Sequence, residues 1–174
     1  MQAGSPSNTA PFSISFFPQQ VALVTVGDNM FPMGYWTVVS KQPFRLLLLV
    51  QLGNHSLSLL REFKEAAFHF MPWEQRDKVA WAGHLSGRDV NKADKLGFTL
   101  KPAQKLKYTR LIEGAEAVYE LVAYKVLEGI STEFEPHVMD VVATHINTHP
   151  LKRKPIFYLS NKDFAALGER WRYP

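Results

Sequence analysis

The stretch VQLGNHSLSLLREF (residues 50–63) marks the point where a predicted strand gives way to a predicted helix. Its apolar run breaks at Gly53. Three small polar residues follow at Asn54, His55 and Ser56, and leucines then recur at helical spacing. Asn and Ser commonly cap a helix because they satisfy the free N–H groups of its first turn. The same N–H groups, at the positive end of the helix dipole, also bind anions such as phosphate. Taken alone, the motif favours a helix cap over an anion site.

The length and composition of the chain favour one domain. The sequence has 174 residues. We expect a tail over residues 1–12 and a single domain over residues 13–174, with a helical insertion at about residues 73–110. The chain has no cysteine, which excludes disulfides, thiolate metal sites and cysteine nucleophiles.

The charge pattern favours a small anionic ligand over a nucleic acid. The chain carries 20 Lys and Arg against 16 Asp and Glu, a net charge of +4, and its densest basic cluster, LKRKP at residues 151–155, is typical of a solvated turn. The first dozen residues lack the cationic start and apolar core of a signal peptide. The longest apolar run, residues 46–50, is too short to cross a bilayer. We therefore expect a cytoplasmic protein that binds neither membranes nor nucleic acid.

The order of predicted elements is a strand-rich first half, a helical middle and a return to strands. Short turns between the first three strands predict antiparallel pairing. This order predicts one β-barrel with helices grafted onto it. The predicted strands lie at residues 21–26, 33–40, 46–50, 66–72, 117–131, 137–148 and in the first part of 155–169. The predicted helices are residues 56–65, a segment within 73–87, and residues 88–98, capped by Asp89 and ended by Gly97.

Five segments in this order resemble the flavin reductase-like family with an FMN-binding split barrel, to which flavoredoxins and small NAD(P)H:flavin oxidoreductases belong. The resemblance implies a mainly β fold, a six-stranded Greek-key split barrel with grafted helices. It also implies a homodimer that holds FMN, or alternatively FAD, noncovalently near the subunit interface, with NAD(P)H as the reductant. The segments are VALVTVGD (21–28), MGYWTVVSKQPFRLLLLV (33–50), NHSLSLLREFKEAAFHFMP (54–72), HLSGRDVNKADKLGFTL (84–100) and KPIFYLSNKDFAALGE (154–169).

The resemblance changes the interpretation of the polar turn before the first helix. Members of the family hold the flavin phosphate at the hydroxyl-rich turn after the third strand, which here matches Asn54, His55 and Ser56. With the neighbouring strands recognised, the anion site becomes the better interpretation. A cap and a phosphate site are compatible because both use the same N–H groups.

The segment GYWTVVS (residues 34–40) is the candidate for the polar edge of the flavin ring. Backbone amides of an extended segment can donate hydrogen bonds to that edge, and two hydroxyls lie within it. Successive side chains of a strand point to opposite faces, so only one of Tyr35 and Trp36 faces a given pocket. For Trp36, packing in the core or at a dimer surface is an equal alternative. The candidate flavin contacts in this segment are Tyr35, Trp36, Thr37, Val38 and Ser40.

Arg88 and Lys92 are four residues apart in a predicted short helix. That spacing places both on one face, where they would meet an anion together, either the flavin phosphate or the nicotinamide dinucleotide. The alternative is an exposed helix start with Asp89 as its cap.

The histidines favour neither a metal site nor a catalytic triad. His145 and His149 have a metal-ligand spacing only within a helix, and their segment is predicted to be a strand that runs into a turn. We expect His69 and His84 to satisfy local hydrogen bonds. No catalytic residue is assigned with certainty, because the cofactor carries the electrons in hydride-transfer enzymes of this type. The segment at residues 133–148 lacks the glycine and aromatic pattern that is frequent in the family there, so the resemblance assigns no nicotinamide contact to it.

Three functions remain open from the sequence. The leading one is an FMN-binding oxidoreductase, an NAD(P)H-dependent flavin reductase. The second is a flavin-binding electron-transfer or storage protein without direct nicotinamide activity. The third is a basic β-barrel that binds nucleic acid or another protein and holds no flavin; few aromatic residues interleave with Arg and Lys on the strands, which speaks against it.

Overall fold

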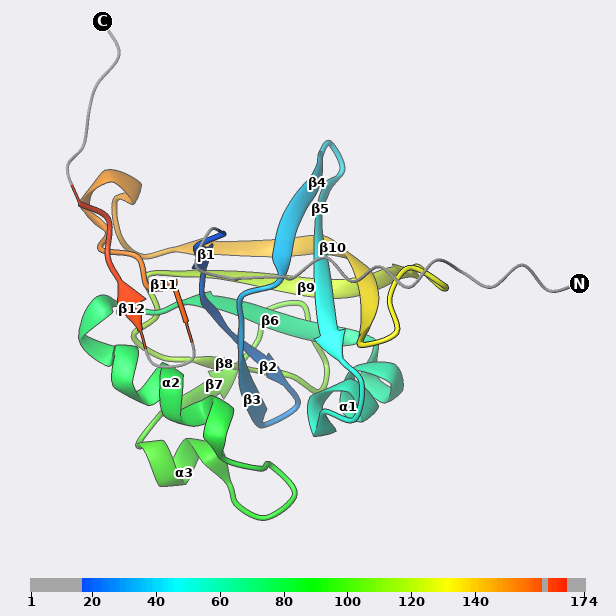
Figure 1. Cartoon of the computed structure of the whole chain (residues 1–174), viewed down its shortest axis with the longest axis horizontal. Coiled ribbons are helices and arrows are strands. Elements are labelled where there is room, and N and C mark those ends of the chain that lie inside the picture. The colour runs from blue at the N-terminus through cyan, green and yellow to red at the C-terminus, as the bar shows by residue number, and fades with distance from the viewer. Residues whose placement is uncertain (1–16, 161–162, 169–174) are drawn as a thin grey trace, which may run out of the picture.

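A seven-stranded antiparallel sheet, curled into a half-open barrel, organises this computed structural model, which describes residues 17–160 and 163–168 (Figure 1). The strand order is β3-β2-β6-β9-β10-β5-β4, and the hairpin of β4 and β5 projects from the body. The expected tail at residues 1–12 lies outside the described residues. The strands are β2 (Ala22–Val26), β3 (Asn29–Met33), β4 (Trp36–Lys41), β5 (Phe44–Gln51), β6 (Glu65–Phe70), β9 (Ala117–Val126) and β10 (Phe134–Ile146).

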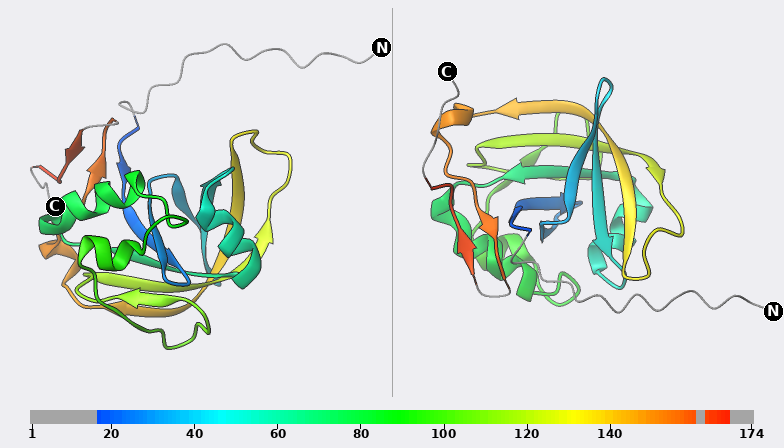
Figure 2. Two further views of the ribbon diagram at one scale, coloured as in Figure 1. Left: turned by 90° about the horizontal axis from the view of Figure 1, so that it is seen from below. Right: turned by 45° about the horizontal axis from the view of Figure 1, so that its top comes forward.

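The helices gather at two ends of this sheet. Helix α1 (His55–Phe63) lies at one end, and α2 (Arg76–His84) with α3 (Lys92–Leu96) lies at the other, near the C-terminal strands (Figure 2). Among the described residues, no helix is long and apolar enough to cross a bilayer. The remaining elements are β1 (Gln19–Gln20), β11 (Phe157–Tyr158) and β12 (Phe164–Ala165) in one small sheet, β7 (Leu100–Pro102) and β8 (Arg110–Ile112) in another, and the 3-10 turns η2 (Trp73–Gln75) and η3 (Pro150–Lys152).

The predicted fold class, mainly β with grafted helices, is confirmed, and the main sheet has seven strands where six were expected. The strand that the sequence analysis missed is β3, of which only Met33 falls in the strand predicted at residues 33–40. The observed chain breaks at Gly34 and Tyr35, so that β3 pairs with β2 while β4 pairs with β5. The short strands β7 and β8 are absent from the predicted set, and β12 lies beyond the first part of residues 155–169, which was predicted as a strand.

Strand β2 separates two apolar cores. Alternate residues of the strand point to opposite faces, so Val24 packs inside the barrel with Phe68 and Leu121. Leu23 points the other way, into a second core that includes Val79 of α2. Every residue of β2 and β6 is buried. A strand covered on both faces needs the nearly continuous apolar run that the sequence shows.

Two buried carboxylates hold the irregular loop between β7 and β8 against the sheet. The carboxylate of Glu65 accepts hydrogen bonds from the backbone N–H groups of residues 107–109, at 2.6–3.0 Å. The carboxylate of Glu120 accepts from the N–H groups of residues 104–105 and from Nε2 of His145 at 2.7 Å. Burial opposes ionisation of Glu120, but these hydrogen bonds outweigh it and lower its pKa. A loop without regular structure is thus fixed by charge-assisted hydrogen bonds.

A buried ammonium joins the helical insertion to the barrel. Lys92 is 6% exposed, and its Nζ donates to the carbonyl oxygens of Met30 in β3 and Ala82 in α2, both at 2.8 Å. Burial lowers the pKa of Lys92. Three elements therefore meet at one amine, because a buried cation is tolerated only when acceptors surround it.

We predict that replacing this amine destabilises the protein. Lys92→Met keeps an unbranched side chain but leaves two buried carbonyl oxygens without their donor. The expected loss is about 2 kcal/mol of the free energy of unfolding, measured by urea denaturation. Lys95→Met, on the exposed side of the same helix, is the matched control and should change stability little. Equal stabilities of the two variants would contradict a structural role for Lys92.

We also predict an acid-sensitive component of stability from His69. Its ring is buried, with Nδ1 donating to the Leu23 carbonyl at 2.9 Å and Nε2 accepting from the Ile112 N–H at 3.0 Å. Burial lowers its pKa from 6.5 to about 4. In the unfolded chain the imidazole gains its proton near its ordinary pKa, whereas the folded one stays neutral down to about pH 4. The free energy of unfolding should therefore fall by about 2 kcal/mol between about pH 7 and pH 5 from this group.

The variant His69→Gln separates this contribution from that of the carboxylates. An amide side chain can donate and accept one hydrogen bond each and does not titrate. Urea denaturation at both pH values should show a smaller loss of stability in the variant than in the wild type. The same loss in both proteins would exclude His69 as the source.

Candidate functional site

A cavity of about 700 Å³ opens between the barrel and the helical insertion. Its walls come from β3, from the link between β3 and β4, from the end of β5, from α2 and from the C-terminal strands. This size lies within the range of small-molecule and cofactor sites. Its lining includes Pro32, Gly34, Tyr35, Gln51, Asn54, Gly83, His84, Phe134, Tyr158 and Phe164.

Aromatic rings form much of the cavity wall. The rings of Tyr35 and Phe134 are 5.2 Å apart, and those of Tyr158 and Phe164 are 5.7 Å apart. Burial raises the pKa of the Tyr158 hydroxyl. Aromatic faces in a partly closed slot suit a flat ligand, because they offer a large apolar contact at low entropic cost.

The narrow spacing between α2 and β3 depends on a glycine. A Cβ atom at Gly83 would lie 3.0 Å from Cγ of Pro32, closer than ordinary packing allows. The helix therefore approaches the strand on its glycine face, which leaves the exposed His84 beside it at the edge of the cavity.

The polar end of the cavity is the N-terminus of α1. Asn54 lines the cavity and is the N-cap, with its Oδ1 accepting from the Ser56 N–H at 2.9 Å. Ser56 is fully buried, and its Oγ accepts from Nδ2 of Asn29 at 2.8 Å. The cap interpretation of the polar turn is therefore confirmed. His55 is the first residue of the helix and is half-buried.

Arg88 brings a cation to this end. It is exposed in the turn after α2, where its backbone N–H bonds to the Ser86 Oγ at 3.2 Å and its Nη2 lies 3.5 Å from the Gly53 carbonyl oxygen. The guanidinium thus lies next to the residue before the cap. A helix N-terminus and a guanidinium both favour a negative charge.

The predicted pairing of Arg88 and Lys92 on one helix is wrong. Helix α3 begins at Lys92 and is capped by Asn91, whose Oδ1 accepts from the Asp94 N–H at 3.2 Å. Arg88 precedes the helix, and the Lys92 amine is buried on two carbonyl oxygens instead of facing an anion. A short helix that ends at Gly97 is confirmed, whereas its predicted cap, Asp89, is wrong because Asn91 caps it.

The residues predicted to contact the flavin ring do not lie together. Tyr35 lines the cavity, whereas Trp36 packs on Phe68 and Phe70 and donates from Nε1 to the Gln20 carbonyl at 2.6 Å. Its ring therefore belongs to the core, the alternative that the sequence left open. Thr37, Val38 and Ser40 lie on the projecting hairpin, outside the lining of the cavity. Their contact with a flavin stays a prediction.

Several lining residues escaped the sequence analysis. Phe134, Tyr158 and Phe164 lie at least 78 residues beyond the polar turn along the chain, and no local motif connects them to it. A search for aromatic residues in the last recognised segment, residues 154–169, would have found Tyr158 and Phe164.

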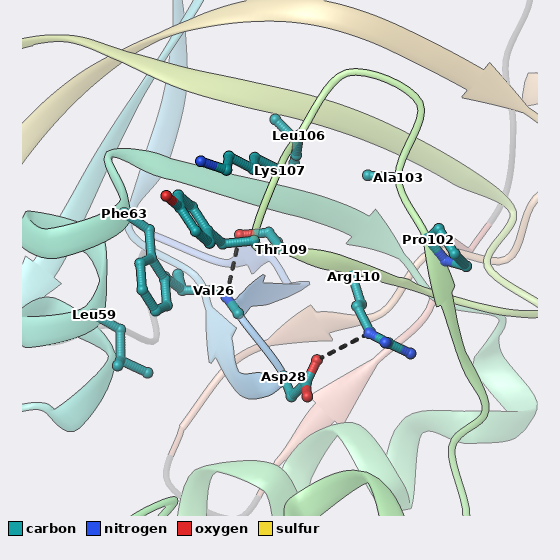
Figure 3. A pocket seen from close by; sticks show the side chains of 12 residues that line it. Val26, Asp28, Leu59, Phe63, Pro102, Ala103, Leu106, Lys107, Thr109 and Arg110 are labelled. Atoms are coloured by element: carbon teal, nitrogen blue, oxygen red, sulfur yellow. Dashed lines mark hydrogen bonds and ion pairs between the residues drawn. The ribbon is translucent and has the colours of Figure 1, made fainter.

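A second hollow of about 560 Å³ lies on another side of the barrel, between α1 and the loop that Glu65 holds (Figure 3). Phe63 and Tyr108 stack there with ring centroids 5.1 Å apart. Its polar groups already pair with one another: the Gly27 N–H donates to Thr109 Oγ1 at 3.1 Å, and Asp28 lies 3.4 Å from Arg110. The first cavity is therefore the candidate site, because the cap of α1 lines it and the Arg88 guanidinium, although outside the lining, lies next to the residue before that cap.

A sequence profile described as the flavin reductase like domain matches residues 14–167. The chain belongs to the flavin reductase-like family. No curated protein matches it. The split-barrel fold implied by the resemblance is confirmed by solved structures of the same shape.

Three of these structures cover nearly the whole chain. An FMN-binding protein from Thermus thermophilus with bound 1-cyclohex-2-enone has a TM-score of 0.84 at 23% identity, over 100% of both chains. A flavoredoxin from Methanosarcina acetivorans has a TM-score of 0.82 at 16% identity, over 99% of this chain and 95% of its own. The NADH:FAD oxidoreductase SgcE6 from Streptomyces globisporus has a TM-score of 0.78 at 19% identity, over 97% and 99%. At these identities the likeness shows the fold alone.

Proposed function

We propose that this flavin reductase-like protein binds FMN in the cavity and uses NAD(P)H to reduce flavin. The observation that carries the proposal is the position of Asn54, which both lines the aromatic cavity and caps α1. A flat ring and an acidic tail would then lie in one continuous site. The names of two similar structures, an FMN-binding protein and an NADH:FAD oxidoreductase, support this choice.

The residues present suit such a cofactor. The N-terminus of α1 and Arg88 would hold the phosphate, and the aromatic pairs around Tyr35 and Tyr158 would pack on the ring. The break at Gly34 and Tyr35 brings backbone to the cavity wall, where amide groups can bond to the polar edge of the ring. A bound flavin supplies the hydride-accepting chemistry, and the protein supplies position and exclusion of water.

The second candidate is an electron-transfer or storage flavoprotein without direct nicotinamide activity. A flavoredoxin among the similar structures favours it. The cavity suits FMN or FAD in either case, and the third reading, a basic barrel without flavin, has no comparable support.

We also propose that the protein forms a homodimer. Large apolar side chains are exposed on strands β4, β9 and β10, and a second copy would cover them. The cytoplasmic location expected from the sequence stays a prediction. The exposed side chains are Val38, Val39, Val122, Tyr124, Val142 and Ile146.

The proposed reaction is tested by the absorption of the purified protein. We expect a yellow protein, or one that becomes yellow with FMN, that bleaches without oxygen when NADH or NADPH is added. A flavin band that persists with both nicotinamides would favour the electron-transfer alternative. A protein that stays colourless with FMN and FAD would contradict both flavin functions.

The contribution of Arg88 is measured by titrating FMN into variants. Arg88→Ala should weaken FMN binding about five- to tenfold, since it removes an exposed cation from the phosphate end. Arg61→Ala removes an exposed arginine from the last turn of α1, outside the lining of the cavity, and should leave the affinity unchanged. An unchanged FMN affinity in Arg88→Ala would remove this residue from the site.

A further inference from the structure

We propose that Asn29 is a positioning residue for the phosphate of bound FMN, acting through the two segments that surround the polar end of the cavity. The inference rests on the proposed flavin-binding function. Asn29 is the first residue of β3, directly after the turn that follows β2. It lies outside the ring-binding part of the cavity.

Asn29 fixes the start of α1. Its Nδ2 donates to the Oγ of Ser56 at 2.8 Å, and Ser56 is fully buried in the first turn of the helix. The Ser56 N–H in turn bonds to the cap residue Asn54. The direction of the first N–H groups of the helix therefore depends on a side chain from another strand.

The Asn29 side chain also packs against the turn that carries Arg88. A Cβ atom at Gly87 would lie 2.1 Å from Oδ1 of Asn29 and 2.7 Å from its Cγ. Only a glycine lets the backbone approach so closely. Arg88 follows immediately, and its Nη2 reaches back to the Gly53 carbonyl oxygen, before the helix cap. Asn29 thus lies between the cation and the helix N-terminus.

The Oδ1 of Asn29 is buried and has no hydrogen-bond partner among the described residues. An unsatisfied buried oxygen destabilises a fold. Asn29 is therefore poorly explained as a purely stabilising residue. The unsatisfied oxygen is explained if the Nδ2 of Asn29 is needed to hold Ser56 while the backbone of Gly87 packs against the same side chain.

The surroundings make this position sensitive to charge. A hollow of about 370 Å³ over the junction is lined by Asn29, Gly87 and Arg88, and also by the carboxylates of Asp28 and Asp89. Asp28 faces Arg110 at 3.4 Å. The Arg110 guanidinium balances the charge of Asp28. A further carboxylate at position 29 would have no such partner and would repel a bound phosphate.

The test compares FMN with riboflavin, which has the same ring and no phosphate. In the wild type we expect FMN to bind at least tenfold more tightly than riboflavin. Asn29→Asp should weaken FMN binding about tenfold and change riboflavin binding less than twofold. Asn29→Ser, which is smaller and uncharged, should also reduce the FMN-to-riboflavin affinity ratio, and it keeps the test available if Asn29→Asp does not fold.

Asn91→Asp is the matched control. It adds the same charge in the same hollow at the exposed cap of α3, where Asp is as good a cap as Asn. It should therefore lower the FMN-to-riboflavin affinity ratio less than Asn29→Asp.

A parallel loss of FMN and riboflavin affinity in both Asn29 variants would show a merely structural role and overturn the inference. Unchanged ratios in both variants, or equal wild-type affinities for the two ligands, would also overturn it while leaving flavin binding intact. A wild type that binds neither ligand would refute the proposed function itself.

Discussion

One buried ammonium holds two walls of the cavity together, strand β3 and helix α2. The Nζ of Lys92 donates to the carbonyl oxygens of Met30 and Ala82. The residues that follow each acceptor, Phe31 in β3 and Gly83 in α2, line the cavity. An amine without an acceptor would be costly at this depth, so the helix and the strand must keep their carbonyl groups directed at it. The distance between the walls is thereby set by hydrogen bonds as well as by apolar packing.

Buried polar side chains also hold the segment from β7 to β8 against the sheet. Glu65 and Glu120 bind backbone N–H groups of the loop between β7 and β8, and the neutral ring of His69 links β2 to β8. In each case a polar side chain of the sheet accepts hydrogen bonds from backbone N–H groups that would otherwise need a neighbouring strand. The barrel thus carries an irregular insertion without disulfides, in a chain that has no cysteine.

In the proposed site, different parts of the structure would bind the flavin ring and the phosphate. The strands and α2 form a slot with aromatic walls. Beyond its Asn54 end, three separate segments meet around Asn29, Ser56 and Arg88. A flavin brings its own redox chemistry. In the proposed site, the protein would fix a flat ring and an anionic tail relative to each other, and a slot that reaches the cap of α1 is suited to that.

Local chemistry made part of this predictable from the sequence. The continuous apolar run of β2, the Asn54 cap and the glycine end of α3 each follow from interactions within a few residues, and the order of segments indicated the family. The place of Trp36 and the partners of Lys92 were not predictable, because an indole or an ammonium has the same local pattern whether it meets a ligand, a core or a carbonyl oxygen. The aromatic walls were hidden for a related reason, since Phe134, Tyr158 and Tyr35 become neighbours only when distant strands pair.

The sequence by itself determined the barrel and the capped helix, through short-range periodicity and capping. Only the tertiary structure decided which polar groups stay free for a ligand, because that depends on which of them the fold has already used to satisfy buried backbone.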